Sequence, residues 1–555
     1  MSDDIRSLAE EYFEYTTEHA PTSAHMRGDY RYMDRFEDAS RKAEDAHIVT
    51  LRSYAATARA FEDTMLSSDD RTTKETLIYD AETAADLAET RQAEFAVDPI
   101  FGLQAVLQVY TPQMTVATAE HADQMVDKYR AIARTFDQTT ERYRQGVSSG
   151  RTPAEFAVEK TVAQLTDWLA TPIADDPMLT VQVPDEFDGE QEAAWKAALQ
   201  NVIATEIRPA VERQRDVIRD EVGPHARSND QPGVFYLPDG DLIYTRALHR
   251  YTTLPMQAGE VHEVGLQQIA KLDDEYRTIA GPLLGTTDLA TIYTQLRDDP
   301  ELHYATGAEV ITASEDAFAK AKAAMGDWFG TLPQTDCLVK ETTAGAVAFY
   351  FPPADDGSRP GVFFMNVTDP ASWGTFEVES TAFHEGIPGH HLQIAIATEL
   401  GDDVPSFRKH TYIGAYSEGW GLYTERLADE MGLYGSELDR VGMLSADSMR
   451  ACRLVVDTGL HGMGWSRDRA IQYVADNSPM TMHQIEEEID RYIGYPGQAC
   501  SYMIGRLEIM RIREQAVAAL GTVFDIKGFH DAVLTHGEMP LGTLDRIVKE
   551  WVTSQ

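Results

Sequence analysis

Hydrophobic residues recur at helical spacing through roughly the first 330 residues of the chain. Leu77, Ala81, Ala84 and Ala88, for example, lie three or four positions apart in a charged background. This spacing places the four side chains on one face of a helix. We therefore expect this part of the chain to be mainly helical. Long amphipathic helices are predicted around residues 117–148, 153–170, 190–221, 259–279 and 309–330.

The pattern changes beyond residue 330. Residues 346–351 are apolar and aromatic in a short run, which predicts a β-strand. Residues 352–360 contain prolines, aspartates and a glycine and predict a turn, and residues 361–367 predict a second strand. From Glu377 onward the helical pattern resumes. The fold class predicted is mostly α, with a small β-hairpin or sheet.

Acidic residues outnumber basic ones by 91 to 48, which gives a formal net charge of −43 in 555 residues. They are spread along the whole chain, as expected of a solvated surface adapted to a halophilic, high-salt cytoplasm; a binding surface for a basic partner is the alternative. Salt screens such repulsion, since the Debye length falls to about 3 Å at 1 M. The charge disfavours partners such as nucleic acids and anionic membranes.

The sequence carries no mark of secretion or membrane insertion. Three scattered cysteines give no disulfide framework. The N-terminus lacks the basic and apolar segments of a signal peptide, and no run approaches the roughly 18 apolar residues of a membrane span. We therefore expect a cytoplasmic protein, monomeric or homodimeric, with no membrane partner.

The segment from His384 to His391 has the sequence His-Glu-Gly-Ile-Pro-Gly-His-His. A hydrolytic zinc site takes three ligands from histidine and carboxylate side chains and leaves one position for water. In the motif H-E-x-x-H the two histidines lie one helical turn apart, with the glutamate as general base. Here position i+4 is Pro388, so this segment departs from that motif by two residues. The alternative is that these are ordinary helix residues near a break.

In an unbroken helix His390 would lie about 240° around the axis from His384, and His391 about 10 Å further along it. Neither could share a metal ion with His384. Pro388 removes a backbone donor and Gly389 relaxes the chain, so a bulge or kink here is plausible. We expect a bulge that absorbs two residues and brings His390 back as the second ligand. His391 stays open as the alternative.

A third ligand is offered by Glu418, within Tyr-Ser-Glu-Gly-Trp-Gly. It opens a predicted helix about 28 residues after the second histidine, which suits a gluzincin-like site. The alternative is that Glu418 only enriches a helix N-terminus in negative charge. Glu425, two turns further on, is a weaker substitute.

Further candidates lie elsewhere in the catalytic half of the sequence. His461 and Tyr502 could donate hydrogen bonds to a developing oxyanion, although each could equally be a core residue. Tyr495 and Gln498 lie in a Pro-Gly turn and are candidates for substrate binding. Arg359 could hold a substrate carboxylate through its forked guanidinium, but a solvated turn explains it equally well.

With these motifs assembled, the chain resembles the domain-of-unknown-function 885 family over nearly its whole length. The resemblance implies a helical fold similar to the zinc oligopeptidases and carboxypeptidases of the gluzincin type. It also implies His384, His390 and Glu418 as metal ligands and Glu385 as general base. The matching segments are residues 384–393, 416–420, 456–461, 495–499 and 529–534, with Pro540 and Leu541.

The function expected is that of a zinc metallopeptidase, with one Zn²⁺ ion, acting on short peptides. Residues 1–330 would form a mainly helical region that walls the cleft, and residues 331–555 the catalytic region. Two alternatives remain open. One is a metal-dependent amidase or esterase with a non-peptide substrate, and the other is a peptide-binding scaffold without catalysis.

Overall fold

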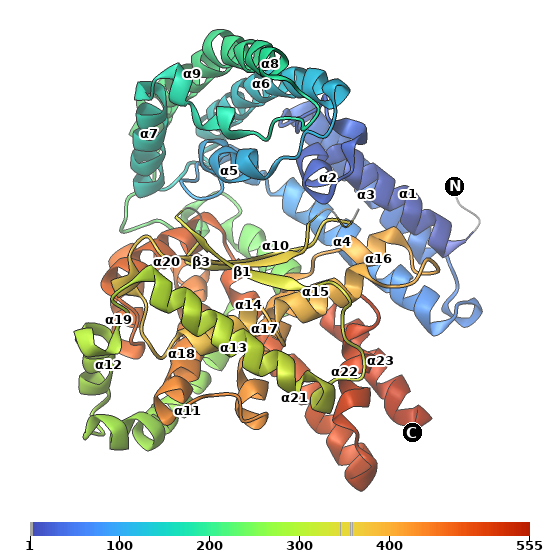
Figure 1. Ribbon diagram of the computed structural model, residues 1–555, viewed down its shortest axis with the longest axis vertical. Coiled ribbons are helices and arrows are strands. Elements are labelled where there is room, and N and C mark those ends of the chain that lie inside the picture. Colours follow the sequence, from blue (N-terminus) through green and yellow to red (C-terminus); the bar gives the residue numbers. More distant parts are fainter. Residues whose placement is uncertain (1–3, 344–345, 356, 358) are drawn as a thin grey trace.

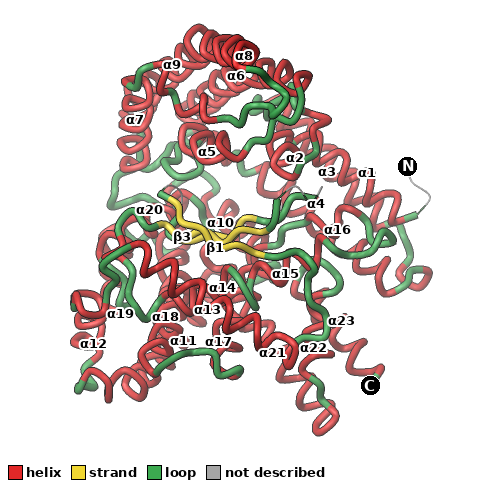
Figure 2. The backbone as a smooth tube through the Cα atoms, in the orientation of Figure 1, coloured by secondary structure: helices red, strands yellow, loops and turns green. Residues whose placement is uncertain are grey.

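The computed structural model describes residues 4–343, 346–355, 357 and 359–555, and helices dominate it (Figures 1 and 2). The first helices pack around a small core of their own that also takes in Phe407. In Figure 1 they run along one side of the molecule. The helices of this core are α1 (Ile5–His19), α3 (Arg41–Arg59) and α4 (Ser68–Glu89), while α2 (Pro21–Arg27) packs its Met26 against the next core.

A second group of helices forms the lobe at the top of Figure 1, around a separate core. Met125, Tyr129, Ile132 and Phe136 follow one another at helical spacing and are fully buried. The predicted helices of this region are therefore confirmed. The predicted helices are α6 (Ala119–Ser149), α7 (Glu155–Ala170) and, for the stretch predicted at 190–221, α8 (Gly189–Val202) and α9 (Arg208–Val217); the short α5 (Leu103–Tyr110) was not predicted.

A third core joins helices from both sides of residue 330. Val261, Ile269, Leu272 and Tyr276 form a buried stripe on α11, which packs against α18. This core therefore extends across the boundary that the sequence analysis placed at residue 330. The helices here are α10 (Gly240–Thr252), α11 (Ala258–Leu284), α12 (Leu289–Asp298), α18 (Glu437–Gly462), α19 (Arg467–Asn477) and α20 (Met482–Gly494).

The predicted hairpin is present as strands β2 (Ala348–Phe351) and β3 (Gly361–Asn366), paired antiparallel with Phe349 opposite Phe364. A strand that the sequence analysis missed, β1 (Cys337–Thr342), pairs parallel with β3 on its other side. The strand order β1-β3-β2 leaves β2 at an edge. Two residues of the predicted turn, Asp356 and Ser358, lie outside the described residues.

The fourth core holds the sheet and the remaining helices. Phe363 and Met365 of β3 are buried in it together with Phe383. It therefore anchors the sheet beside the helices that carry the candidate ligands. The helices of this core are α13 (Gly307–Trp328), α14 (Val378–Glu385), α15 (His390–Thr398), α17 (Gly414–Glu430), α21 (Ser501–Leu520), α22 (Ile526–Leu534) and α23 (Leu541–Ser554), while α16 (Ser406–His410) places Phe407 in the first core.

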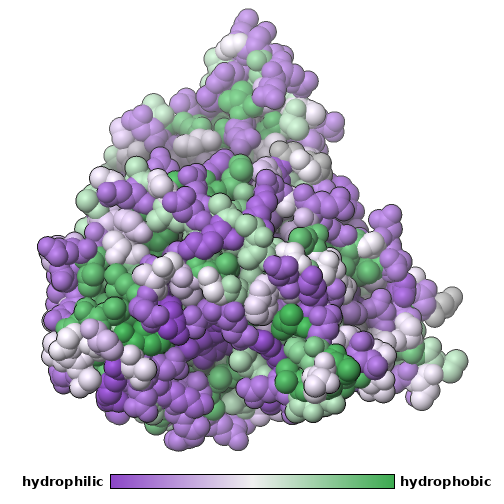
Figure 3. Space-filling view, turned by 60° about the horizontal axis from the view of Figure 1, so that its bottom comes forward, coloured by the Kyte–Doolittle hydropathy of each residue, from purple (hydrophilic) through white to green (hydrophobic). Residues whose placement is uncertain are grey.

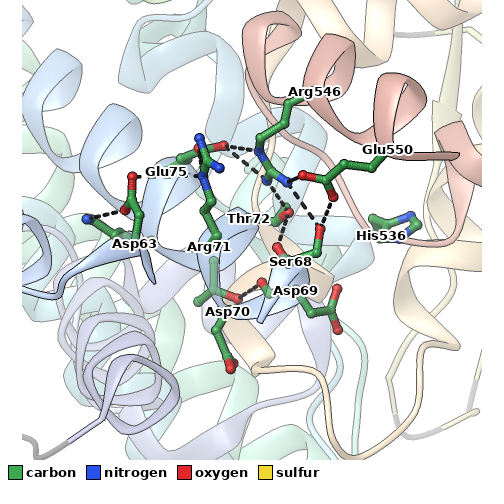
Figure 4. A network of polar contacts seen from close by, with 12 residues as sticks. Asp63, Ser68, Asp69, Asp70, Arg71, Thr72, Glu75, His536, Arg546 and Glu550 are labelled. Atoms are coloured by element: carbon green, nitrogen blue, oxygen red, sulfur yellow. Dashed lines mark hydrogen bonds and ion pairs between the residues drawn. The ribbon is translucent and has the colours of Figure 1, made fainter. Parts of the chain in front are cut away.

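Polar contacts fasten the N-terminal helix α4 to the last helix, α23 (Figure 4). Arg546 donates to Glu75 at 3.1 Å and to Thr72 at 2.7 Å. It also donates to Glu550, one turn away on its own helix. The two ends of the sequence are therefore held together by partly buried, charge-assisted bonds.

The helices of the described residues include none with a stretch long and apolar enough to cross a bilayer. On the face drawn in Figure 3, hydrophilic residues are spread throughout, and hydrophobic residues lie between them in separate patches.

Helices α17 and α21 touch at Gly419 and Gly505. A Cβ atom at Gly505 would collide with the carbonyl oxygen of Ala415. We expect Gly505→Ala to lower the free energy of unfolding by on the order of 2 kcal/mol, because the two backbones must separate. Gly326→Ala, on α13 with open space around it, is the control and should leave stability unchanged or slightly higher. Equal urea-unfolding curves for the two variants would contradict the close packing.

Candidate metal centre

A four-residue break separates the two histidines of the His-Glu-Gly-Ile-Pro-Gly-His-His segment. Helix α14 ends at Glu385 and α15 begins at His390. The Ile387–Pro388 peptide bond is cis, and a Cβ atom at Gly389 would collide with the carbonyl oxygen of His384. The prediction of a bulge within one helix is therefore wrong, because the chain leaves the helix altogether. The break nevertheless returns His390 to His384.

Three candidate ligands converge from three helices. The ligand atoms of His384, His390 and Glu418 all lie within 4.8 Å of one another, and the three residues are buried. Both imidazole Nε2 atoms face Glu418 Oε2, at 3.5 Å from His384 and 3.4 Å from His390. Zinc bonds of about 2.0–2.1 Å in a tetrahedral arrangement require ligand separations of about 3.3–3.4 Å. The two separations to Glu418 thus match those that a tetrahedral zinc ion requires.

Further side chains fix the orientation of the ligands. Glu425 Oε1 lies 2.8 Å from Nδ1 of His384, so Glu425 orients this imidazole and is not placed as a substitute ligand. Tyr412 donates its hydroxyl to Glu418 Oε1 at 2.9 Å. Gly421 leaves room for the His384 ring, since a Cβ atom there would lie 2.7 Å from Nε2.

Negative charge dominates the environment of His384. Burial lowers the pKa of this imidazole, but Glu418 and Glu425 outweigh the burial and raise the pKa to about 9. Burial likewise raises the pKa of Glu418, and the two histidines more than reverse this, so that the pKa lies well below its usual value. The carboxylate is therefore ionised, and its charge favours a cation between the imidazoles.

His391 points away from this group and towards the sheet. Its Nδ1 lies 3.0 Å from the hydroxyl of Tyr350 on β2, and its Nε2 lies 3.1 Å from the carbonyl oxygen of Thr335. Both ring nitrogens are thus engaged elsewhere. Of the two histidines that the sequence left open, the geometry selects His390.

Two predicted catalytic residues lie beside the cluster. Glu385 is partly buried and makes no hydrogen bond or ion pair within the described part of the chain, while its charge helps to raise the pKa of His384. The ring of Tyr502 stacks on that of His384, with 6.2 Å between centroids. The carboxylate of Glu385 and the phenol of Tyr502 therefore lie beside the candidate ligands.

A cavity of about 400 Å³ lies next to Tyr412 and the start of α17. Tyr495 lines it and packs against Tyr251 at 5.2 Å. Gln498 lies further along the same turn, where its Oε1 accepts a hydrogen bond from Arg491. The sequence analysis missed Tyr412, because no motif marks a tyrosine six residues before a ligand. The other lining residues are Glu44, His47, Tyr79, Ala84, Leu87, Ala88, Gln92, Ala93, Arg250, Ile413 and Gly414.

Two other predicted site residues are held by different partners. His461 is fully buried; its Nδ1 accepts from the backbone N–H of Val234, and its Nε2 lies 3.0 Å from the carbonyl oxygen of Tyr492. No N–H remains on this ring for an oxyanion. Arg359 lies 4.1 Å over the ring of Phe351 in its own hairpin and donates to Pro352. The structure therefore does not bring these two residues into the group formed by the candidate ligands.

Asp457, four residues before His461, fastens the Pro-Gly turn to α18. It accepts from the hydroxyl of Tyr244 at 2.6 Å and from the backbone N–H of Gly497 at 3.1 Å. Burial raises its pKa to about 7, against the effect of these hydrogen bonds. The motif around Asp457 thus holds in place the turn that leads to Tyr502.

The raised pKa of Asp457 gives a pH dependence of stability. Between its unfolded pKa of about 3.9 and its folded pKa of about 7, the native state binds the proton more tightly. The contribution is therefore complete below about pH 4 and is lost as the pH rises to 7. Across this range, the free energy of unfolding of the wild type should fall by on the order of a few kcal/mol relative to Asp457→Asn. Parallel profiles in urea titrations would show that Asp457 titrates normally.

Glu425 should strengthen metal binding through His384. We expect Glu425→Gln to weaken zinc affinity about 10–100-fold, because the imidazole loses its negatively charged partner. Competition with a chromophoric chelator measures this change. Glu508→Gln, which alters a partly buried pair with Arg511 on α21, is the matched control and should bind zinc as the wild type does. Unchanged affinity in both variants would remove Glu425 from the site.

Comparisons with known proteins place the chain in a family without an assigned activity. The family described as "Bacterial protein of unknown function (DUF885)" matches residues 21–548. No curated protein matches the chain. Among solved structures, a "putative lipoprotein" from Colwellia psychrerythraea aligns with a TM-score of 0.92 at 24% identity, over 99% of both chains. One of unknown function from Shewanella oneidensis aligns with a TM-score of 0.73 at 17% identity, over 99% of this chain and 100% of that one. These similarities establish the fold.

Proposed function

This chain belongs to the DUF885 family, and we propose that it is a metal-dependent peptidase that hydrolyses short peptides. One observation carries the proposal. His384, His390 and Glu418 bring three ligand atoms within 4.8 Å of one another, and Glu385 stands next to them without an ion-pair partner among the described residues. A binding protein would have no need of a carboxylate in that position.

The donor set fits one Zn²⁺ ion. Two imidazole nitrogens and one carboxylate oxygen are the ligands of a gluzincin-like catalytic zinc site, which leaves a position for water. When bound, the ion lowers the pKa of water and polarises the carbonyl group of a substrate. Glu425 and Tyr412 would hold His384 and Glu418 in position for it.

Glu385 would transfer the proton, and Tyr502 would stabilise the developing charge by a hydrogen bond. Glu385 takes a proton from the attacking water and passes it to the leaving amine. Tyr502 donates its hydroxyl to the carbonyl oxygen that becomes negative during the attack. Burial and the nearby Glu418 raise the pKa of Tyr502, so its hydroxyl keeps the proton at neutral pH.

The surroundings suit a short, extended peptide. Strand β2 is an edge strand and could pair with a substrate backbone by main-chain hydrogen bonds. The cavity beside Tyr412 is lined by Tyr495 and by residues of α3 and α4. At about 400 Å³ it has room for side chains but not for a folded protein. The N-terminal helices would thus wall the site.

Location is also a proposal. The three cysteines are unpaired and buried, which fits a reducing cytoplasm. Both similar structures carry the description "putative lipoprotein", which favours the alternative of a lipid-anchored protein. Cell fractionation separates the two.

Exchange of the general base tests the peptidase proposal. We expect Glu385→Gln to lose at least about 10³-fold in turnover of a mixed peptide library while binding zinc normally, because only the proton acceptor is lost. Product formation is followed by mass spectrometry at molar salt, which screens the charge of −43. Equal turnover in both proteins, or none in either, would contradict the proposal. Cleavage of small amides or esters in place of peptides would favour the alternative hydrolase.

A further inference from the structure

Three arginines from two helices gather around Tyr502. Arg450 and Arg453 lie one turn apart on α18, with their guanidinium carbons 5.7 Å and 4.4 Å from the centre of the Tyr502 ring. Arg491, on α20, acts on Tyr502 through its charge. Because Tyr502 stacks on His384, this group adjoins the candidate metal centre. In a chain with a net charge of −43, it is a local concentration of positive charge.

The carboxylates near these arginines are engaged by more than one partner. Arg453 and Arg491 share the carboxylate of Glu488, at 2.8 Å and 3.0 Å. Arg450 lies 3.8 Å from Glu425, whose same oxygen is already engaged by His384. Two carboxylates thus form ion pairs with the three guanidinium groups, and one of the two also serves the candidate ligand. Arg450 also acts through its charge on Glu377.

Two of the guanidinium groups also have a nitrogen atom without a hydrogen-bond acceptor among the described residues. Nη1 of Arg453 and Nε of Arg450 are buried and make no hydrogen bond to any described residue. Arg453 is only 5% exposed. A buried charged donor that lacks an acceptor costs free energy, and such groups are concentrated at functional sites. An anion bound here would supply the acceptor that these two donors lack.

We propose that Arg450 and Arg453, with Arg491 behind them, bind the free C-terminal carboxylate of a peptide, so that the chain acts as a carboxypeptidase. This proposal rests on the proposed peptidase function. The guanidinium carbons lie 4.4–5.7 Å from the ring whose hydroxyl would face the scissile carbonyl. An extended chain advances about 3.3–3.6 Å per residue. The carboxylate would thus lie one or two residues beyond the cleaved bond.

Matched peptides test this specificity. Two peptides of one neutral sequence are compared, one ending in a free carboxylate and the other in an amide. We expect the wild type to cleave the acid with a kcat/KM at least about 30-fold higher, as for the loss of one partner of a buried charge pair. Equal cleavage of both peptides would overturn the carboxypeptidase proposal while leaving the peptidase function intact.

Substitution of Arg450 tests whether the arginines cause the preference for a free C-terminal carboxylate. Arg450→Gln should lower kcat/KM for the acid about 30-fold more than for the amide, so that the two rates converge. Arg440→Gln is the matched control; Arg440 lies on the same helix but is paired with Asp429 and Glu437. It should keep the preference of the wild type. An acid preference that survives in Arg450→Gln would overturn the assignment.

Binding without turnover separates the two proposals. Zinc-loaded Glu385→Gln is titrated with each peptide in a calorimeter. Tighter binding of the acid, by about tenfold or more, supports the carboxylate site even if no peptide is cleaved by the wild type. Equal affinity for the acid and the amide overturns it. A gain in affinity from a glutamate side chain in the amide peptide would also overturn it, since the recognised group would then not be the C-terminus.

Discussion

The candidate centre depends on the four-residue break between α14 and α15. A continuous helix would turn the second imidazole away from the first. By leaving the helix after Glu385 and starting a new one at His390, the chain places two imidazoles at right angles, with 4.8 Å between the ring centroids. Glu418 then reaches both from α17. Every chemical role proposed for the neighbouring residues follows from this convergence.

Close helix packing makes the convergence possible. Gly419 lets α17 approach α21, and Gly421 leaves space for the ring of His384. The glycines on both sides of Trp420 therefore have steric roles, while the indole nitrogen donates to the carbonyl oxygen of Pro388 at 3.0 Å. The segment around Glu418 thus provides one candidate ligand. It also supports the break whose two ends hold the other two, His384 and His390.

Much of this arrangement could be predicted from the sequence, because it depends on local patterns. Hydrophobic periodicity located the long helices, and the apolar runs at 346–351 and 361–367 located the hairpin. The residue types at 384–391 and at 418 indicated the candidate ligands. Strand β1 was missed because its sequence, Cys-Leu-Val-Lys-Glu-Thr, is half polar and its partner lies more than twenty residues away.

What the sequence could not supply are contacts between distant segments. Tyr412 and the arginines around Tyr502 have no distinguishing motif, since their importance comes from neighbours on other helices. His461 lies in a motif that made it a candidate from the sequence. In the structure, however, both of its ring nitrogens form hydrogen bonds with backbone groups. The bulge predicted at Pro388 correctly brought His390 back to His384. It was wrong about the backbone, because spacing alone does not distinguish one distorted helix from two separate helices.

The most direct measurement is anomalous diffraction from crystals grown with zinc, recorded on both sides of the zinc absorption edge. A single peak should lie about 2.0–2.2 Å from Nε2 of His384, Nε2 of His390 and a carboxylate oxygen of Glu418. The absence of a peak between these three side chains, or coordinates in which they point apart, would contradict the metal centre and with it the proposed hydrolytic chemistry.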